Sequence, residues 1–197
     1  MKYHMNRINP LLTLALLLLS TSVAAYEEPN YEIVYESDNI EVRYYDERQV
    51  VQTRSGGPIR RFKRLFDYIN GANEDSEKIA MTSPVTELSS GKGVIMQFYL
   101  PSRFNKNNAP LPINDNVEIF SIDAGYYGVI RFSGKSNTRN FNKHAEILKK
   151  ELDNDNIQII GPSIKATFDP PFTKANLRRN ESMFLVDWDK GGSEWKT

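Results

Sequence analysis

The chain has 197 residues with 25 basic and 25 acidic side chains, 40% hydrophobic residues and no cysteine. This length fits one domain with a substantial core, and the lack of cysteine excludes disulfides, thiol catalysis, iron–sulfur clusters and zinc fingers. Balanced charge argues against a nucleic-acid-binding protein, which needs a basic surface to neutralise phosphates.

The first 25 residues have the features of an export signal. Lys2 and Arg7 give a cationic start, residues 11–19 form a leucine-rich apolar run, and residues 23–25 supply small side chains at the expected cleavage site. The run is far shorter than the roughly 20 residues that span a bilayer as a helix. We therefore expect a cleavable signal peptide over residues 1–25, a periplasmic or secreted protein, and no stable membrane insertion after cleavage.

After the signal, apolar and polar residues alternate with the period of two that is typical of half-buried strands. Two amphipathic helices interrupt this pattern, one predicted over Pro58–Asn70 and one from about Asn140 to Leu152. Residues 190–197 are expected to form a flexible tail. Strands are predicted at 31–36, 40–45, 50–54, 79–82, 85–88, 94–100, 117–122, 126–132, 157–160, 164–168 and 183–188.

Two parts of the chain share one pattern. Residues 40–57 and 117–134 align without a gap at an offset of 77, and four of these eighteen positions are identical, Glu41 and Glu118 among them. The same order of strand, turn, strand, glycine, helix and strands follows in both. We interpret this as a duplicated ββαββ unit in an α+β fold. Because neither copy can close its own sheet edges, the two are expected to pair into a curved sheet or distorted barrel.

The first predicted helix combines an apolar face with basic edges. Its apolar face has the spacing i, i+3, i+4, i+7 and consists of Phe62, Leu65, Phe66 and Ile69. Its basic edges carry Arg60, Arg61 and Arg64. Such a surface suits a flat apolar ligand with carboxylates, because a guanidinium group binds carboxylate bidentately and stacks on aromatic systems. The alternatives are that the face belongs to the core and that the basic residues are an ordinary solvated surface.

Three segments resemble signatures of the SOUL/heme-binding protein family. Residues 68–85 (YINGANEDSEKIAMTSPV) resemble its "YI-G-N" turn followed by "KI-MT-PV", and residues 96–112 resemble its "FYLP … PP-P" strand and proline loop. Residues 168–181, with FDPPF and RRNE, resemble its "YDPPF … RRNE" segment. The resemblance assigns residues 26–189 to a SOUL-like heme-binding domain. It implies a distorted antiparallel β-barrel flanked by two helices, which binds heme or a related tetrapyrrole in a shallow apolar cleft.

The resemblance leaves the iron ligand open. Some family members have been assigned an axial histidine in the second strand, where this chain has Tyr44. His144, which borders the apolar stripe of the second helix, is the only histidine after the signal. Tyr44 and His144 are therefore the metal-ligand candidates. Other family members are thought to hold tetrapyrroles mainly by apolar contacts, and this mode fits the chain better.

No enzyme motif is present, since the chain contains no GxSxG, HExxH, P-loop or GxGxxG pattern. We predict a non-enzymatic, exported and monomeric carrier or buffer of heme or another tetrapyrrole, with a basic rim and no nucleic-acid partner. The alternative is a small-molecule effector-binding or protein-interaction module of the same fold that binds no heme.

Overall fold

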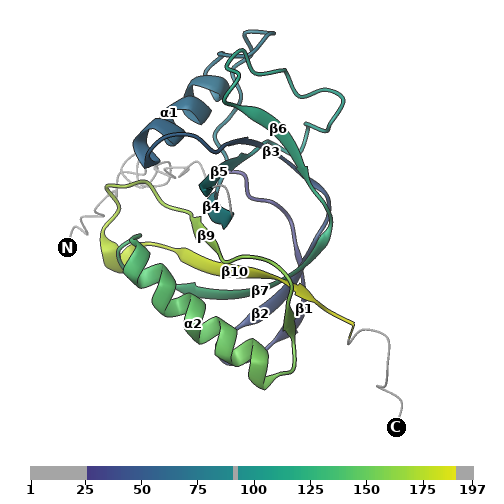
Figure 1. The fold of residues 1–197 in the computed structure, drawn as a ribbon, viewed down its shortest axis with the longest axis vertical. Coiled ribbons are helices and arrows are strands. Elements are labelled where there is room, and N and C mark those ends of the chain that lie inside the picture. Colours follow the sequence, from purple (N-terminus) through teal and green to yellow (C-terminus); the bar gives the residue numbers. More distant parts are fainter. Residues whose placement is uncertain (1–25, 91–92, 190–197) are drawn as a thin grey trace, which may run out of the picture.

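The computed structural model describes residues 26–90 and 93–189 of the chain (Figure 1). Within these ranges ten strands and two α-helices form an α+β fold, in which one antiparallel sheet curls into a half-barrel. The predicted signal peptide and the predicted tail lie outside the described residues. Within the described ranges, no helix has the length and apolar character needed to cross a bilayer.

The elements follow the sequence pattern closely. The first part of the chain forms β1 (Glu32–Glu36), β2 (Glu41–Tyr45), β3 (Arg48–Thr53), α1 (Pro58–Ile69), β4 (Val85–Ser90) and β5 (Gly93–Tyr99). The second part forms β6 (Glu118–Ile122), β7 (Gly125–Phe132), α2 (Thr138–Asn154), β8 (Gln158–Ile159), β9 (Ile164–Thr167), a 3-10 turn (Ala175–Leu177) and β10 (Asn180–Asp187).

The strand predicted over residues 79–82 does not form. Its flanks make only isolated bridges, Lys78 with Asn70 and Thr82 with Glu27. The Ile79 amide donates to the carbonyl of Ile69 at the end of α1, and the Ile79 side chain is buried in the core under that helix. Thr82 is buried as well, so side chains of this segment are held in the core although its backbone does not join the sheet.

The order of strands in the sheet is symmetric about its centre. The sheet runs β1-β2-β7-β10-β9-β4-β5-β3-β6, with β8 paired to β10. Outward from the central β9·β4 pair, β10 corresponds to β5, β7 to β3 and β2 to β6. Two copies of a ββαββ unit would give this order if each lent its first strand to the edge of the other. The duplication itself stays a prediction.

The two helices cover the outer faces of the two halves of the sheet. Leu65, Tyr68 and Ile69 of α1 pack with residues of β3 and β5 such as Val51 and Phe98. On the other half, Leu148 and Leu152 of α2 pack against β7 and β10, where Ile130 and Phe184 lie. Burying one leucine contributes about 1.5–3 kcal/mol, so each helix is anchored mainly by this apolar face.

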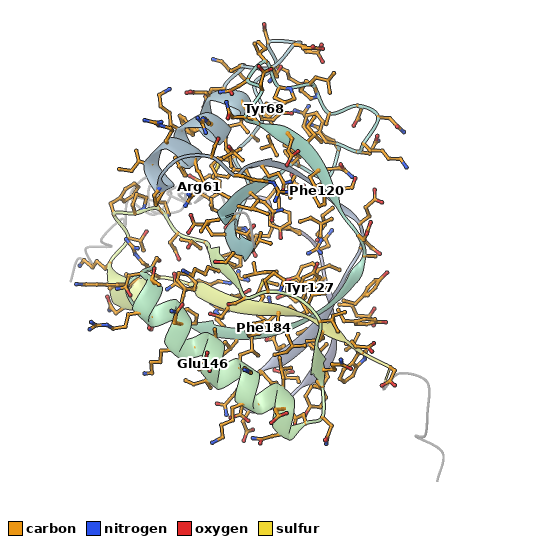
Figure 2. All side chains as sticks on the ribbon, viewed as in Figure 1. Arg61, Tyr68, Phe120, Tyr127, Glu146 and Phe184 are labelled. Carbon is orange, nitrogen blue, oxygen red and sulfur yellow. The ribbon has the colours of Figure 1, made fainter. Side chains whose placement is uncertain are left out.

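The inner, concave face of the sheet is lined differently. Figure 2 shows Tyr127 of β7 on this inner side and Phe184 of β10 on the side covered by α2. Tyr127 packs there with Tyr45 of β2, their rings 5.5 Å apart and nearly perpendicular. The half-barrel therefore has apolar outer layers under its helices and a polar, aromatic interior.

Candidate functional site

Phe62 and Phe66 form a stacked aromatic pair at the surface of α1. Their ring centroids lie 5.9 Å apart at an interplanar angle of 17°, and the two residues expose 41% and 45% of their surface. The ring of Phe62 also meets the buried ring of Phe98 edge-on at 5.2 Å. The core thus fixes a flat apolar surface that remains open to solvent.

The other two members of the predicted apolar wall lie beneath this pair. Leu65 and Ile69 expose only 0% and 4% of their surface and belong to the core between α1 and the sheet. One helix face with a spacing of i, i+3, i+4, i+7 is therefore split between core and surface. Phe62 and Phe66 are the members of the set that a ligand can reach.

Of the three predicted rim arginines, Arg61 is buried. Its Nη2 lies 3.2 Å from Oε1 of Glu87 on β4, its Nη1 donates to the carbonyl of Gly56 at 2.5 Å, and it exposes 7% of its surface. Arg61 therefore ties α1 to the sheet. Arg61 and Tyr68, which are both labelled in Figure 2, come from this helix.

Arg60 and Arg64 remain near the surface. Nη1 of Arg64 donates to the carbonyl and hydroxyl oxygens of Ser55, both at 2.6 Å, in the loop before the helix. Arg60 is exposed, its stem lies over Gly56, and its guanidinium forms no ion pair within the described part of the chain. Residues two apart in a helix lie about 200° apart around its axis, so Arg60 and Arg64 carry their positive charge on the side of α1 away from the Phe62–Phe66 pair.

Tyr44 lies on a different part of the sheet. Its ring packs on that of Tyr126 in β7 at 5.1 Å, and it is half-buried on the outer side of β2. Its neighbour Arg43 points to the opposite face, as strand alternation requires, and is 2% exposed. Arg43 is therefore placed away from the Tyr44 hydroxyl.

His144 lies on α2, which covers the other half of the sheet from α1. Its ring stacks on Phe132 at 3.8 Å with an interplanar angle of 1°. Its Nδ1 lies 2.8 Å from the carbonyl oxygen of Asn140. Because a carbonyl only accepts, Nδ1 is the donor in this hydrogen bond. Among the described residues no group of three or more His, Cys, Asp or Glu side chains could hold a metal ion.

Sequence reasoning did not predict the ion cluster inside the half-barrel. The carboxylate of Glu181 on β10 is fully buried and accepts from Arg43 at 2.8 Å and from Arg179 at 2.9 Å. Arg179 also pairs with Glu28 at 2.9 Å and stacks over Phe168. Burial by itself would lower the pKa of Arg43, but Glu181 outweighs it and raises that pKa above the ordinary value. The cluster joins β2, β10 and the N-terminal segment.

A second buried polar chain crosses the inner face of the other half. Thr86 donates to Oε1 of Gln97, Nε2 of Gln97 donates to Oε1 of Gln52 at 2.8 Å, and Gln52 donates to Glu118 at 2.7 Å. In the sequence, the sign of this polar interior was that polar residues occupy predicted strand positions. Alternation alone could not tell whether those positions face the interior or the solvent.

Two tyrosines with raised pKa values predict a loss of stability in alkaline solution. Burial raises the pKa of Tyr45 to about 12, against the opposing effect of Arg43, and burial with Glu77 and Asp75 raises that of Tyr68 to about 12. The folded protein holds these protons more tightly than the unfolded chain does. Their stabilisation is complete below pH 10 and is lost as pH rises from about 10 to 12.

We expect the free energy of unfolding to fall by roughly 2 kcal/mol per tyrosine across this window. Urea unfolding measured at intervals from about pH 9 upward checks the slope. Tyr68→Phe serves as the control, since it should remove its share of the slope while losing the hydrogen bond to the carbonyl of Pro110. A stability that stays flat to about pH 12 in the unsubstituted protein would be inconsistent with these pKa values.

Comparison with known proteins agrees with the fold. The C-terminal domain of EcmrR superposes with a TM-score of 0.56 at 14% identity, covering 80% of this chain and 98% of that one. EcmrR in its complex with DNA superposes with a TM-score of 0.58 at 13% identity. The match covers 75% of this chain and 57% of the EcmrR chain. A hydrolase from Listeria innocua gives 0.55 at 7% identity, covering 78% and 94%. At such low identity the likeness concerns the fold alone.

The sequence comparison is more specific. No curated protein matches the chain significantly. The family model described as SOUL heme-binding protein matches residues 26–185, which is most of the chain and nearly all of its described part. Its span includes α1, both copies of the predicted repeat and most of β10. The chain therefore belongs to the SOUL heme-binding protein family.

Proposed function

We propose that this protein is an exported, non-enzymatic binding protein that carries or buffers heme or a related tetrapyrrole. The family supplies the class of ligand, because it is a family of heme-binding proteins. The observation that supports a particular surface is the exposed Phe62–Phe66 pair on α1, anchored by Phe98. A tetrapyrrole would lie against these two rings.

The residues of this surface fit the macrocycle of heme, because aromatic side chains favour contact with a flat π-system. The arginines of the predicted rim lie elsewhere on α1. Arg61 is committed to Glu87, and Arg60 and Arg64 lie about half a turn around the helix from the two rings. Leu65 and Ile69 contribute by holding the helix on the core.

The same surface offers no candidate for iron ligation. The α1 segment contains no His, Cys or Met, and its one tyrosine, Tyr68, is buried with its hydroxyl donating to the carbonyl of Pro110. Tyr44 and His144 belong to β2 and α2, away from the half of the sheet that α1 covers. We infer that apolar contacts with the exposed aromatic pair hold the ligand, which is cargo for this protein.

Export and a monomeric state are parts of the same proposal. The signal-like residues 2–25 support transfer out of the cytoplasm, either to a periplasm or to the medium. Balanced charge supports a protein that stays off nucleic acid. A carrier or buffer of heme outside the cytoplasm would need no catalytic group.

Titration with hemin and with metal-free protoporphyrin tests this function. We expect a saturable shift of the Soret band with both ligands and dissociation constants that agree within about threefold, because iron ligation contributes little. If neither ligand gave a saturable shift at micromolar concentration, the proposed tetrapyrrole binding would be contradicted. If hemin bound much more tightly than metal-free protoporphyrin, iron ligation and not apolar contact would hold the ligand.

The variants Tyr44→Phe and His144→Ala test ligation directly. Neither side chain lies on α1, so we expect each variant to bind hemin within about twofold of the unsubstituted protein. Hemin titration under identical conditions measures this, with metal-free protoporphyrin as the control for indirect effects. A variant that loses affinity for hemin and keeps affinity for protoporphyrin would identify its residue as an iron ligand and contradict the proposal.

A further inference from the structure

The loop between β9 and β10 exposes two large apolar side chains to solvent. Phe172 exposes 86% of its surface and Leu177 exposes 67%, so they are two of the three most exposed large apolar residues in the described part of the chain. Single apolar side chains at a surface are common, but a group of them on one projecting loop marks a surface that contacts a membrane or another protein.

Arg178 holds this loop in one conformation from the inside. Its Nε donates to the carbonyl of Thr173 at 2.8 Å, and its Nη2 donates to the carbonyl of Pro171. Its Nη1 donates to the hydroxyl of Ser136 at 3.2 Å, which ties the loop to the segment before α2. The two exposed apolar side chains are therefore presented by a fixed backbone, and their contact with a partner needs no ordering of the loop.

The loop lies beside the beginning of α2. The amide of Gly134 donates to the carbonyl of Ala175 at 2.8 Å, and the side-chain amide of Asn180 donates to the carbonyl of Gly134 at 3.1 Å. Figure 1 shows the loop and the first turn of α2 at the same end of the molecule. Residues 133–143 and 170–178 thus form one end of the protein.

This end is strongly basic in a chain whose total charge is balanced. Residues 133–143 and 170–178 contain five basic side chains and no acidic one, namely Lys135, Arg139, Lys143, Lys174 and Arg178. All of them except Arg178 are exposed. The ion pairs found within residues 26–90 and 93–189 involve other side chains. The positive charge of this end is therefore open to an anionic partner.

Apolar tips surrounded by cations are complementary to the surface of an anionic membrane. The apolar side chains enter the boundary between head groups and acyl chains, and lysine and arginine meet the lipid phosphates. Each basic residue near such a surface strengthens binding by about fivefold. A stable protein interface, in contrast, buries about 800 Å² on each partner, which is far more than two side chains provide. The chemistry of this end therefore favours a lipid surface.

We propose that this end of the protein binds peripherally to membranes that contain anionic phospholipids. Phe172 and Leu177 enter the head-group region, and the exposed basic residues around them contact the phosphates. The contact is reversible, because only one loop enters the lipid. It is independent of tetrapyrrole binding on α1.

Sedimentation with lipid vesicles tests the charge requirement, without any tetrapyrrole. The protein lacks its predicted signal peptide, so that residues 1–25 contribute nothing. The probes are vesicles of phosphatidylcholine alone and of phosphatidylcholine with about 30% phosphatidylglycerol. We expect at least tenfold tighter binding to the anionic vesicles, and a loss of at least fivefold when NaCl rises from about 0.1 M to 0.5 M. Equal binding to both vesicles, or no binding at about 1 mM anionic lipid, overturns the proposal.

Removing the apolar tips tests their role. Phe172→Ala/Leu177→Ala should weaken binding to the anionic vesicles at least tenfold, because the buried apolar area is lost. Leu111→Ala/Ile113→Ala is the matched control, since these side chains expose 57% and 65% of their surface in the proline loop that contacts the end of α1. The control should bind as the unsubstituted protein does. Unchanged binding in the loop variant, or an equal loss in the control, overturns the proposal.

Reversing the charge of this end tests the basic residues. Lys135→Glu/Lys174→Glu should weaken binding to the anionic vesicles at least tenfold. The matched control is Lys149→Glu/Lys150→Glu, because both lysines are exposed on the second half of α2, away from the loop. This control changes the net charge by the same amount and should lose at most about twofold. Equal losses in the two variants would reduce the effect to net charge and overturn the assignment to this end.

Fluorescence of the variant Phe172→Trp reports the position of the loop directly. Its emission should shift to the blue on anionic vesicles and be quenched by lipids brominated on the acyl chains. The unsubstituted protein, with Trp188 and Trp195, is the control. Quenching no stronger than in this control overturns the proposal.

A second copy of the chain is the other possible partner for the exposed loop. We expect analytical ultracentrifugation to show a monomer at the concentrations used with vesicles. A dimer that Phe172→Ala/Leu177→Ala abolishes, together with no vesicle binding, would assign the loop to self-association and overturn the proposal.

Discussion

Replacing Glu181 with alanine should lower the free energy of unfolding by about 3–5 kcal/mol, the range measured when one partner of a buried ion pair is removed. Glu181 is completely buried, and its carboxylate binds Arg43, itself 2% exposed, and Arg179. The substitution leaves the Arg43 guanidinium in the interior with Glu41 as its remaining ionic partner. Urea unfolding followed by circular dichroism measures the loss.

Glu28→Gln is the matched control for this effect. Glu28 also pairs with Arg179, but its side chain is 38% exposed, so we expect a loss below about 1 kcal/mol. The double variant Arg43→Met/Glu181→Leu should recover much of the lost stability, because it leaves no fully buried charge without a partner: Arg179 keeps Glu28, and Glu41 is partly exposed. A loss in Glu181→Ala no larger than that in Glu28→Gln would show that burial of the cluster is not what makes it important.

The double variant Phe62→Ala/Phe66→Ala should weaken both hemin and metal-free protoporphyrin by at least tenfold. The pair provides the exposed flat surface, and both rings project from one side of α1. Removing two aromatic contacts of about 0.5–1.5 kcal/mol each, together with the buried area, accounts for a change of this size. Absorbance titration in the Soret region measures it for each ligand.

Phe120→Ala is the matched control for the aromatic pair. Phe120 exposes 46% of its surface, nearly the same fraction as Phe66 with 45%. It pairs with Val50 of β3 on the face of the sheet away from α1. It should bind both ligands with unchanged affinity. If the Phe62/Phe66 variant kept full affinity, the tetrapyrrole would have to bind to another surface of the protein.

Much of the fold could be predicted from the sequence because periodicity is a local property. The limits of α1, for example, were predicted within one residue, since Pro58 fits the first turn and Gly71 adopts the left-handed conformation that ends a helix. Residues 79–82 were predicted wrongly as a strand, because their apolar side chains pack in the core under α1 while the backbone makes only isolated bridges. The family, too, was predicted correctly from its signature segments.

The candidate site was harder to predict because exposure depends on distant residues. Arg61 looks like a surface residue in the sequence, yet Glu87 on β4 holds it in the interior. Arg43 and Glu181 are separated by 138 positions, and only the sheet order brings them together. The same order explains the RRNE segment, in which Arg179 and Glu181 hold the interior while Arg178 donates to the carbonyl of Thr173. The residues of the RRNE segment therefore have a structural role.

Backbone amide mapping by NMR tests the central claim most directly. With metal-free protoporphyrin added, the amides of α1 around Phe62 and Phe66 should shift in a saturable way, while those around Tyr44, His144 and Arg48 stay in place. This result would locate the tetrapyrrole on α1 without help from an iron ligand. Saturable shifts centred on the half-barrel interior or on α2, with α1 unchanged, would contradict the account.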